Sequence, residues 1–334
     1  MGKFIINLCK FLIILLGIGI ISFVLLTFYF KEIPALKFSD SYSFNEKMLF
    51  LGRSSKGANV LAIGSSMSLN NLHSETVTLE LQSKKFINTA SWGMSIRDDY
   101  DFLKSLNKIY KITSIIIVSN IIDFSEADKN IDFEFVKSYL NVRPLKIFLS
   151  FIRNFDLKYY LLNFKYAQNV RNCINNYDYL KFDNYGTINF SKENFVINNA
   201  RWNRDFLEKP KDIQYLYLDS LADYCMSNRI ELLFFQSPMR TGIYSRLNQS
   251  QSDMNNLHLE KVKNILERDN FQFINPSDKL WQDSLFIDGI HFNEAGARLF
   301  TEFCFNKIDS IRLHSNKDYS IKSSCLVPNQ FIKP

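Results

Sequence analysis

Five short apolar runs rich in β-branched residues recur along this 334-residue chain, and they constrain its fold more than any other feature. Runs of this length, bounded by polar turns, are typical of strands that are buried on both faces. Helical periodicity separates the runs, and alternation of strand and helix favours a parallel sheet covered by helices. The sequence therefore predicts an α/β fold with strands at Asn59–Ile63, Phe86–Ala90, Ser114–Val118, Glu231–Phe235 and Phe271–Asn275.

The helices expected between these strands carry apolar residues at three- and four-residue spacing. Ser95 and Asp98 resemble a capping box, although Asp is a poorer partner than Glu at the third helical position. Asn293 can cap the N-terminus of the last helix of the sheet domain. The expected helices cover residues 95–106, 212–225, 256–266 and about 293–308.

The segment Phe11–Phe30 holds twenty residues without a charge, after Lys3 and Lys10. At 1.5 Å per residue such a helix crosses a hydrocarbon core of about 30 Å. A cleaved signal peptide would have a shorter apolar region and a small-residue cleavage site, and a core helix would need protein on all sides. We expect an uncleaved signal anchor that crosses the cytoplasmic membrane once, with the body on the extracytoplasmic side.

The remaining chain divides by composition and pattern. Residues 1–31 form the expected anchor and 32–56 a linker, followed by a sheet domain made of 57–124 and 212–310. Between the third and fourth strands, residues 125–211 are too long for an ordinary connection. They are expected to form an inserted helical cap or, alternatively, extra helices packed on the sheet. Residues 311–334 are expected to form a polar tail.

Charge and cysteine content narrow the classes of partner. The net charge of +6 is spread along the chain, so a nucleic-acid-binding footprint is missing. None of the cysteines lies in a C-x-x-C pair or at metal-ligand spacing from a histidine. Those outside the anchor fit either buried free thiols or disulfides. The cysteines are Cys9, Cys173, Cys225, Cys304 and Cys325.

Gly64, Ser65 and Ser66 follow the first predicted strand where a helix should begin. The carboxyl ends of parallel strands are where ligands bind in open α/β sheets. A serine at that edge is exposed, and the N–H groups of the helix that follows can stabilise an oxyanion. Turn preferences alone would also place serine there.

Asp288 and His291 lie three residues apart directly before the last predicted helix. This spacing can place both side chains on one side of a turn, so that the carboxylate orients the imidazole. A serine nucleophile needs such a base to accept its proton. The other histidines, His73, His258 and His314, lie in expected helices or in the tail and are interpreted as structural or solvent-exposed.

Together the two segments resemble the SGNH (GDSL-like) hydrolase superfamily over about residues 57–124 and 212–308. The resemblance implies a flavodoxin-like parallel sheet, with Ser66 as nucleophile, His291 as general base and then acid, and Asp288 as its orienter. Ser65 stands where the family has Asp, a position outside the triad. Ser65 remains an alternative nucleophile, with Ser68 a more distant one.

The family's second and third blocks supply oxyanion donors. Gly93 matches the glycine of the second block, although it could also serve only its turn. Asn120 is the nearest match to the asparagine of the third block, whose usual G-x-N-D pattern is absent here. The resemblance therefore implies an oxyanion hole formed by Gly93 and Asn120.

The chemistry that follows from the resemblance is ping-pong acyl transfer through an acyl-serine, without a metal or organic cofactor. We expect a membrane-anchored acyltransferase that moves O-acetyl or similar groups on cell-envelope polysaccharide or from an acylated carrier, beside a multispanning membrane acyltransferase. An extracytoplasmic carboxylesterase is the first alternative. A non-catalytic accessory protein that binds a glycan or a partner is the second.

Overall fold

The computed structural model describes residues 2–54, 57–83, 85–173, 177–191, 199–203, 207–276 and 280–324, without the side chains of 199 and 314–324. Its centre is a five-stranded parallel sheet with the strand order β2-β1-β3-β4-β5. This is the flavodoxin-like order, so the predicted fold class and all five predicted strands are confirmed. The strands are β1 (Val60–Ile63), β2 (Phe86–Asn88), β3 (Ser114–Ser119), β4 (Glu231–Gln236) and β5 (Gln272–Ile274).

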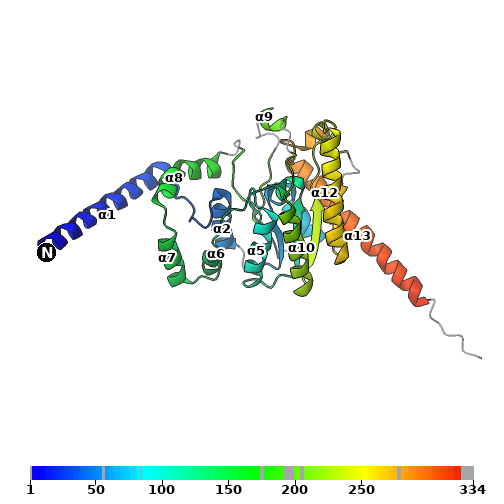
Figure 1. Cartoon of the computed structure of the whole chain (residues 1–334), viewed down its shortest axis with the longest axis horizontal. Helices are drawn as coiled ribbons and strands as arrows, with labels where there is room; N and C mark the ends of the chain where they lie inside the picture. Colours follow the sequence, from blue (N-terminus) through cyan, green and yellow to red (C-terminus); the bar gives the residue numbers. More distant parts are fainter. Residues whose placement is uncertain are drawn as a thin grey trace, which may run out of the picture.

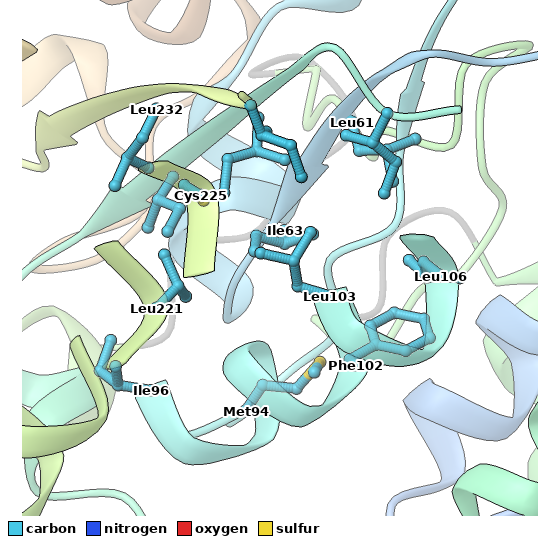
Figure 2. Packing of buried hydrophobic residues seen from close by; sticks show 14 of the residues in the cluster. Leu61, Ile63, Met94, Ile96, Phe102, Leu103, Leu106, Leu221, Cys225 and Leu232 are labelled. Atoms are coloured by element: carbon cyan, nitrogen blue, oxygen red, sulfur yellow. The ribbon is translucent and has the colours of Figure 1, made fainter. Parts of the chain in front are cut away.

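Helices cover both faces of the sheet (Figure 1). Alternate residues of β3 face opposite layers: Ile115 and Ile117 belong to one apolar cluster, and Ile116 and Val118 to the other. Figure 2 shows the first layer, where Leu61, Ile63 and Leu232 from the sheet meet helical side chains. The first layer contains α5 (Ile96–Asn107), α10 (Asp212–Ser227) and α12 (Gln249–Arg268), and the second contains α3 (Ser66–Asn71), α4 (Ser74–Glu80) and α13 (Glu294–Ser324).

The predicted helix starts are present in the structure. Ser95 and Asp98 form a complete capping box at α5, because each side chain accepts a backbone N–H of the other residue. The Asn293 side chain accepts the N–H of Gly296, 3.0 Å away, at the start of α13. Helix α13 continues to Ser324, well past the expected end near Ile308. Part of the expected tail is therefore helical, while residues 325–334 lie outside the described residues.

Of the predicted linker 32–56, the described residues 32–54 belong to the folded body, so that prediction is wrong. They contain α2 (Tyr42–Ser54), whose Phe44, Met48 and Leu51 are at most 1% exposed and belong to the first apolar layer. The spacing of these three residues places them on one face of the helix. Helix α2 also contributes the buried Lys47, whose Nζ donates to the carbonyl oxygens of Asn88 and Gly186 at 3.0 and 2.5 Å.

Helix α1 (Gly2–Phe30) is long and apolar enough to cross a bilayer, and none of its residues is buried in the protein. Ion pairs hold the chain between α1 and α2 against the segment inserted between β3 and β4. Arg171 bonds to both Glu32 and Glu46 at 2.6 Å, and Lys37 Nζ lies 2.9 Å from Asp156 Oδ2.

The inserted segment between β3 and β4 is largely helical. Part of it packs on the body, because Phe135 and Val136 join the first layer. Another part docks near the end of β1: Leu180, Ile188 and Phe190 form a separate apolar cluster with residues that include Leu69 and Ile287. The insertion thus holds both extra packing helices and a segment beside the carboxyl edge of the sheet. Its helices are α6 (Phe133–Leu140), α7 (Pro144–Arg153), α8 (Leu157–Asn172) and α9 (Asn199–Trp202).

Three short helical turns complete the described elements: η1 (Ile121–Phe124), α11 (Thr241–Tyr244) and η3 (Asp283–Leu285). The four described cysteines are free; Cys9 and Cys173 are exposed, and Cys225 and Cys304 are buried. For these four residues the structure therefore agrees with free thiols rather than disulfides.

Candidate active site

Ser66 is the first residue of α3, directly after the turn that leaves β1. Gly64 makes this turn possible with φ +133°, and a Cβ there would lie 2.5 Å from Ser68 Oγ. A side chain at this position is therefore excluded by both backbone strain and space. The Ser65 hydroxyl caps the helix by accepting the Met67 N–H at 3.1 Å. Ser66 is left partly exposed at the N-terminus of α3, where N–H groups lack intrahelical partners.

Ser66, His291 and Asp288 are in hydrogen-bond contact. Ser66 Oγ lies 2.8 Å from His291 Nε2, and His291 Nδ1 lies 2.7 Å from Asp288 Oδ2. The two outer residues are separated by more than two hundred positions in the chain, so this contact is made by the fold. A hydroxyl bonded to an imidazole that is itself oriented by a carboxylate is the arrangement that activates a serine nucleophile.

Asp288 is held in its ionised form. Its Oδ1 accepts the N–H groups of Ile290 and His291 at 2.8 and 2.7 Å, which also fixes the turn between the two residues. Burial opposes ionisation most strongly, but the charge and hydrogen bonds of His291, together with hydrogen bonds from Tyr177 and Ile290, lower the pKa of this carboxyl to about 2. The carboxylate therefore remains charged at neutral pH and fixes the Nδ1–H tautomer of the imidazole.

Tyr177, from the insertion, completes this arrangement. Its hydroxyl donates to Asp288 Oδ2 and lies 2.9 Å from His291 Nδ1. Burial and the Asp288 carboxylate raise the pKa of Tyr177 well above its usual value, so that the phenol stays protonated. The Arg201 guanidinium lies 3.7 Å from the centre of the Tyr177 ring. Both residues line the pocket that contains Ser66. The insertion thus reaches the acid–base pair itself.

The pocket in front of Ser66 has a volume of about 250 Å³. The sequence identified two of its residues, Ser66 and His291, and predicted an inserted cap without naming the residues that it contributes. Aromatic rings and one arginine provide most of the remaining wall. The lining residues are Ser66, Asn70, Trp92, Tyr177, Asp178, Phe190, Arg201 and His291.

Asn71, at the end of α3, ties this helix to the loop that carries His291. Its Nδ2 donates to Ile290 O at 2.9 Å and to Ser237 Oγ at 2.8 Å, and its Oδ1 accepts the Phe292 N–H at 2.8 Å. The side chain is fully buried. One short helix therefore presents Ser66 at its first residue and holds the histidine loop from its last.

Neither Ser65 nor Ser68 contacts His291 through any hydrogen bond of the described residues. Ser65 is 1% exposed and lies against Asp123, whose pKa is raised to about 7 by burial despite hydrogen bonds from the Ser65 and Ser119 hydroxyls. Ser68 Oγ donates to Ile63 O at 2.7 Å and accepts the Val118 N–H at 2.8 Å. Both hydroxyls hold the turn together.

Gly93 and Asn120, expected at the oxyanion hole, are not among the residues that line the pocket. Gly93 has φ +62°, a left-handed backbone conformation that favours glycine. Asn120 is fully buried; its Oδ1 accepts the Ile122 N–H at 3.0 Å, and its Nδ2 lies 3.7 Å from Met67 Sδ. Their oxyanion role stays a prediction. Trp92, next to Gly93, does line the pocket.

The other described histidines are structural, as interpreted from the sequence. His73 caps α4, with Nδ1 2.9 Å from Thr76 Oγ1, and is not inside that helix. His258 is buried in α12, 2.9 Å from the Tyr215 hydroxyl, and burial lowers its pKa to about 3. The side chain of the fourth histidine, His314, lies outside the described part of the chain. Among the described residues, no group of three or more His, Cys, Asp or Glu is placed to hold a metal ion.

Comparison with solved structures finds bacterial esterases. The psychrotrophic esterase EstA from Pseudoalteromonas sp. matches 77% of this chain and 99% of its own, with 15% identity and a TM-score of 0.34. The M. smegmatis aryl esterase matches 76% and 99%, with 10% identity and the same TM-score. Neither the family models nor the curated proteins give a match.

Proposed function

We propose that this protein is a serine acyltransferase or esterase that works through an acyl-serine intermediate at Ser66. One observation carries the proposal: Ser66 Oγ lies 2.8 Å from an imidazole whose other nitrogen is bonded to the ionised Asp288. A surface serine without a function has no need of this arrangement, which fixes the tautomer and orientation of the base.

The reaction follows from these contacts. His291 Nε2 accepts the Ser66 proton while Oγ attacks the ester carbonyl, and Asp288 stabilises the imidazolium that forms. His291 then gives this proton to the leaving alcohol, which leaves an acyl-serine. A second hydroxyl, activated by the same nitrogen, attacks the acyl group and releases Ser66. We assign stabilisation of the oxyanion to N–H groups at the start of α3, where the helix has N–H groups without intrahelical partners.

The acceptor in this proposal is a hydroxyl of a cell-envelope polysaccharide rather than water. Helix α1 supports a site of action beside a membrane, and the half-buried Trp92 gives the pocket an aromatic ring against which a sugar can pack. The donor is an acylated carrier or an acyl group handed on by a multispanning acyltransferase. Hydrolysis to an esterase product is the second candidate, because it differs only in the hydroxyl that resolves the intermediate.

Fluorophosphonate labelling of the full-length protein in detergent tests the nucleophile. The wild type and Ser65→Ala should be labelled, and Ser66→Ala should not. Absence of labelling in the folded wild type, or its loss in Ser65→Ala alone, would refute the assignment. Following the acyl group of p-nitrophenyl acetate into an oligosaccharide or into acetate then separates transfer from hydrolysis.

A further inference from the structure

Helix α7 of the insertion presents an apolar surface on the side that faces away from the body. Leu145, Phe148, Leu149 and Ile152 are each more than half exposed and follow each other at three- and four-residue spacing, which places them on one helical face. The other side of α7 packs inward, because Ile147 and Phe151 lie against the first apolar layer. Helix α7 thus has apolar side chains on two sides. One side packs against the protein, and the other is exposed.

The next helix along the chain, α8, also exposes large apolar side chains. Leu161 is 49% exposed and Leu162 is 66% exposed. Soluble monomeric proteins seldom expose so many large apolar side chains on two consecutive helices. We call the exposed side chains Leu145, Phe148, Leu149, Ile152, Leu161 and Leu162 the α7–α8 surface.

Helix α8 lies against the end of α1 (Figure 1). The Phe164 ring is 5.4 Å from the Phe23 ring and 6.2 Å from the Phe30 ring, measured between centroids. Phe23 precedes Phe30 by seven residues, about 10 Å along a helix axis. Helix α8 is therefore placed beside the last two turns of α1, at a level that a bilayer crossed by α1 would reach.

Charge distinguishes a lipid surface from other occupants. Arg143, Lys146 and Arg153 of α7 are exposed, and no acidic residue occurs between Val142 and Phe155. Exposed Lys158 continues the basic character into α8. A short helix that has Phe and Leu on one face and whose own charged residues are all basic is typical of segments that lie in the interface of an anionic bilayer.

We propose that the α7–α8 surface is a second membrane contact, seated among anionic phospholipids in the leaflet where α1 leaves the bilayer. Contact with α1 and the exclusively basic charge of α7 favour phospholipid over a soluble protein or a second copy of this chain. The proposal requires α1 to cross the bilayer and is independent of the chemistry at Ser66. It gives the body a fixed orientation relative to the membrane.

The test uses the full-length protein in liposomes of phosphatidylcholine and phosphatidylglycerol, with Cys9, Cys173 and Cys325 replaced by serine. An environment-sensitive fluorophore is attached at Leu149→Cys or Leu161→Cys. The matched control is Leu257→Cys, because Leu257 of α12 is 53% exposed and lies on a helix remote from α1 in Figure 1. We expect blue-shifted emission and quenching by brominated lipid at 149 and 161, and neither at 257.

Emission at 149 and 161 equal to that of the control would overturn the proposal. A blue shift without quenching by brominated lipid would also overturn it, because a protein would then cover the surface. Lys146→Glu combined with Arg153→Glu tests the charge. Quenching should fall several-fold in vesicles that contain phosphatidylglycerol, and unchanged quenching would refute the role of anionic lipid.

Discussion

Asn71 Nδ2 lies 2.9 Å from the carbonyl oxygen of Ile290, so the helix that begins at Ser66 is bonded at its other end to the histidine loop. The distance between nucleophile and base therefore depends on the end of α3 as well as on its start. The Asn71 side chain is fully buried and makes two hydrogen bonds to the histidine loop and one to Ser237. Its role can therefore be tested separately from the triad.

Asn71→Ala should lower the free energy of unfolding by about 2–4 kcal/mol, since it leaves Ile290 O and the Phe292 N–H buried without partners. The rate of fluorophosphonate labelling should fall more than about tenfold, as the loop loosens. Asn141→Ala is the control, because exposed Asn141 bonds only to Lys137 O, and it should change neither quantity measurably. Unchanged labelling by a stable Asn71→Ala protein would contradict this role.

Tyr177→Phe should reduce kcat/KM about tenfold or more, because it removes a hydrogen bond to a charged carboxylate. The pKa of Asp288 should rise from about 2, since that hydrogen bond helps to lower it. The measurement is the pH profile of kcat/KM for an activated ester. Tyr179→Phe serves as the control, because Tyr179 does not line the pocket. Equal loss in both variants would assign the effect to packing.

Asp288→Asn should reduce kcat by about 10³–10⁴-fold while the protein stays folded, because an amide can no longer hold the Nδ1–H tautomer or stabilise the imidazolium. Single-turnover acylation of Ser66, followed by mass spectrometry, measures this loss. A loss smaller than about tenfold would show that Asp288 does not orient the base.

The buried carboxyl of Asp123 predicts a pH dependence of stability. Its pKa in the folded protein, about 7, lies above the unfolded value of about 3.9. Well below pH 3.9 both states are protonated, so no penalty arises; as pH rises from there toward 7, mainly the unfolded state ionises. The free energy of unfolding should fall by about 4 kcal/mol over this range.

Asp123→Asn should remove most of this dependence, so that it is more stable than the wild type at pH 7 and about equal at pH 4. Thermal unfolding followed by circular dichroism at the two pH values gives the comparison. Asp99 lies nearby, and burial raises its pKa as well, so Asp99→Asn should have the same sign. An Asp123→Asn protein less stable than the wild type at pH 7 but not at pH 4 would contradict the raised pKa of Asp123.

Patterns local in sequence predicted the sheet, its main helices and the short turn that carries Asp288 and His291. The linker prediction was wrong because three apolar residues, Phe44, Met48 and Leu51, are too few to identify a core helix from the sequence. Their burial depends on partners in the core that are distant in the chain. Tyr177 could not be found, since it meets Asp288 across 111 positions and its own segment has no motif. Contacts of this kind depend on how the insertion docks.

The pinned connection between α1 and α2 has a consequence for how the site meets its substrates. With α1 in a bilayer, the ion pairs of Glu32 with Arg171 and of Lys37 with Asp156 restrict rotation of the folded domain relative to α1. Ser66 then stays at a constant height above the lipid. If the protein transfers acyl groups as proposed, it meets its acceptors by diffusing within the membrane, and only acceptors whose own chains reach that height can be modified.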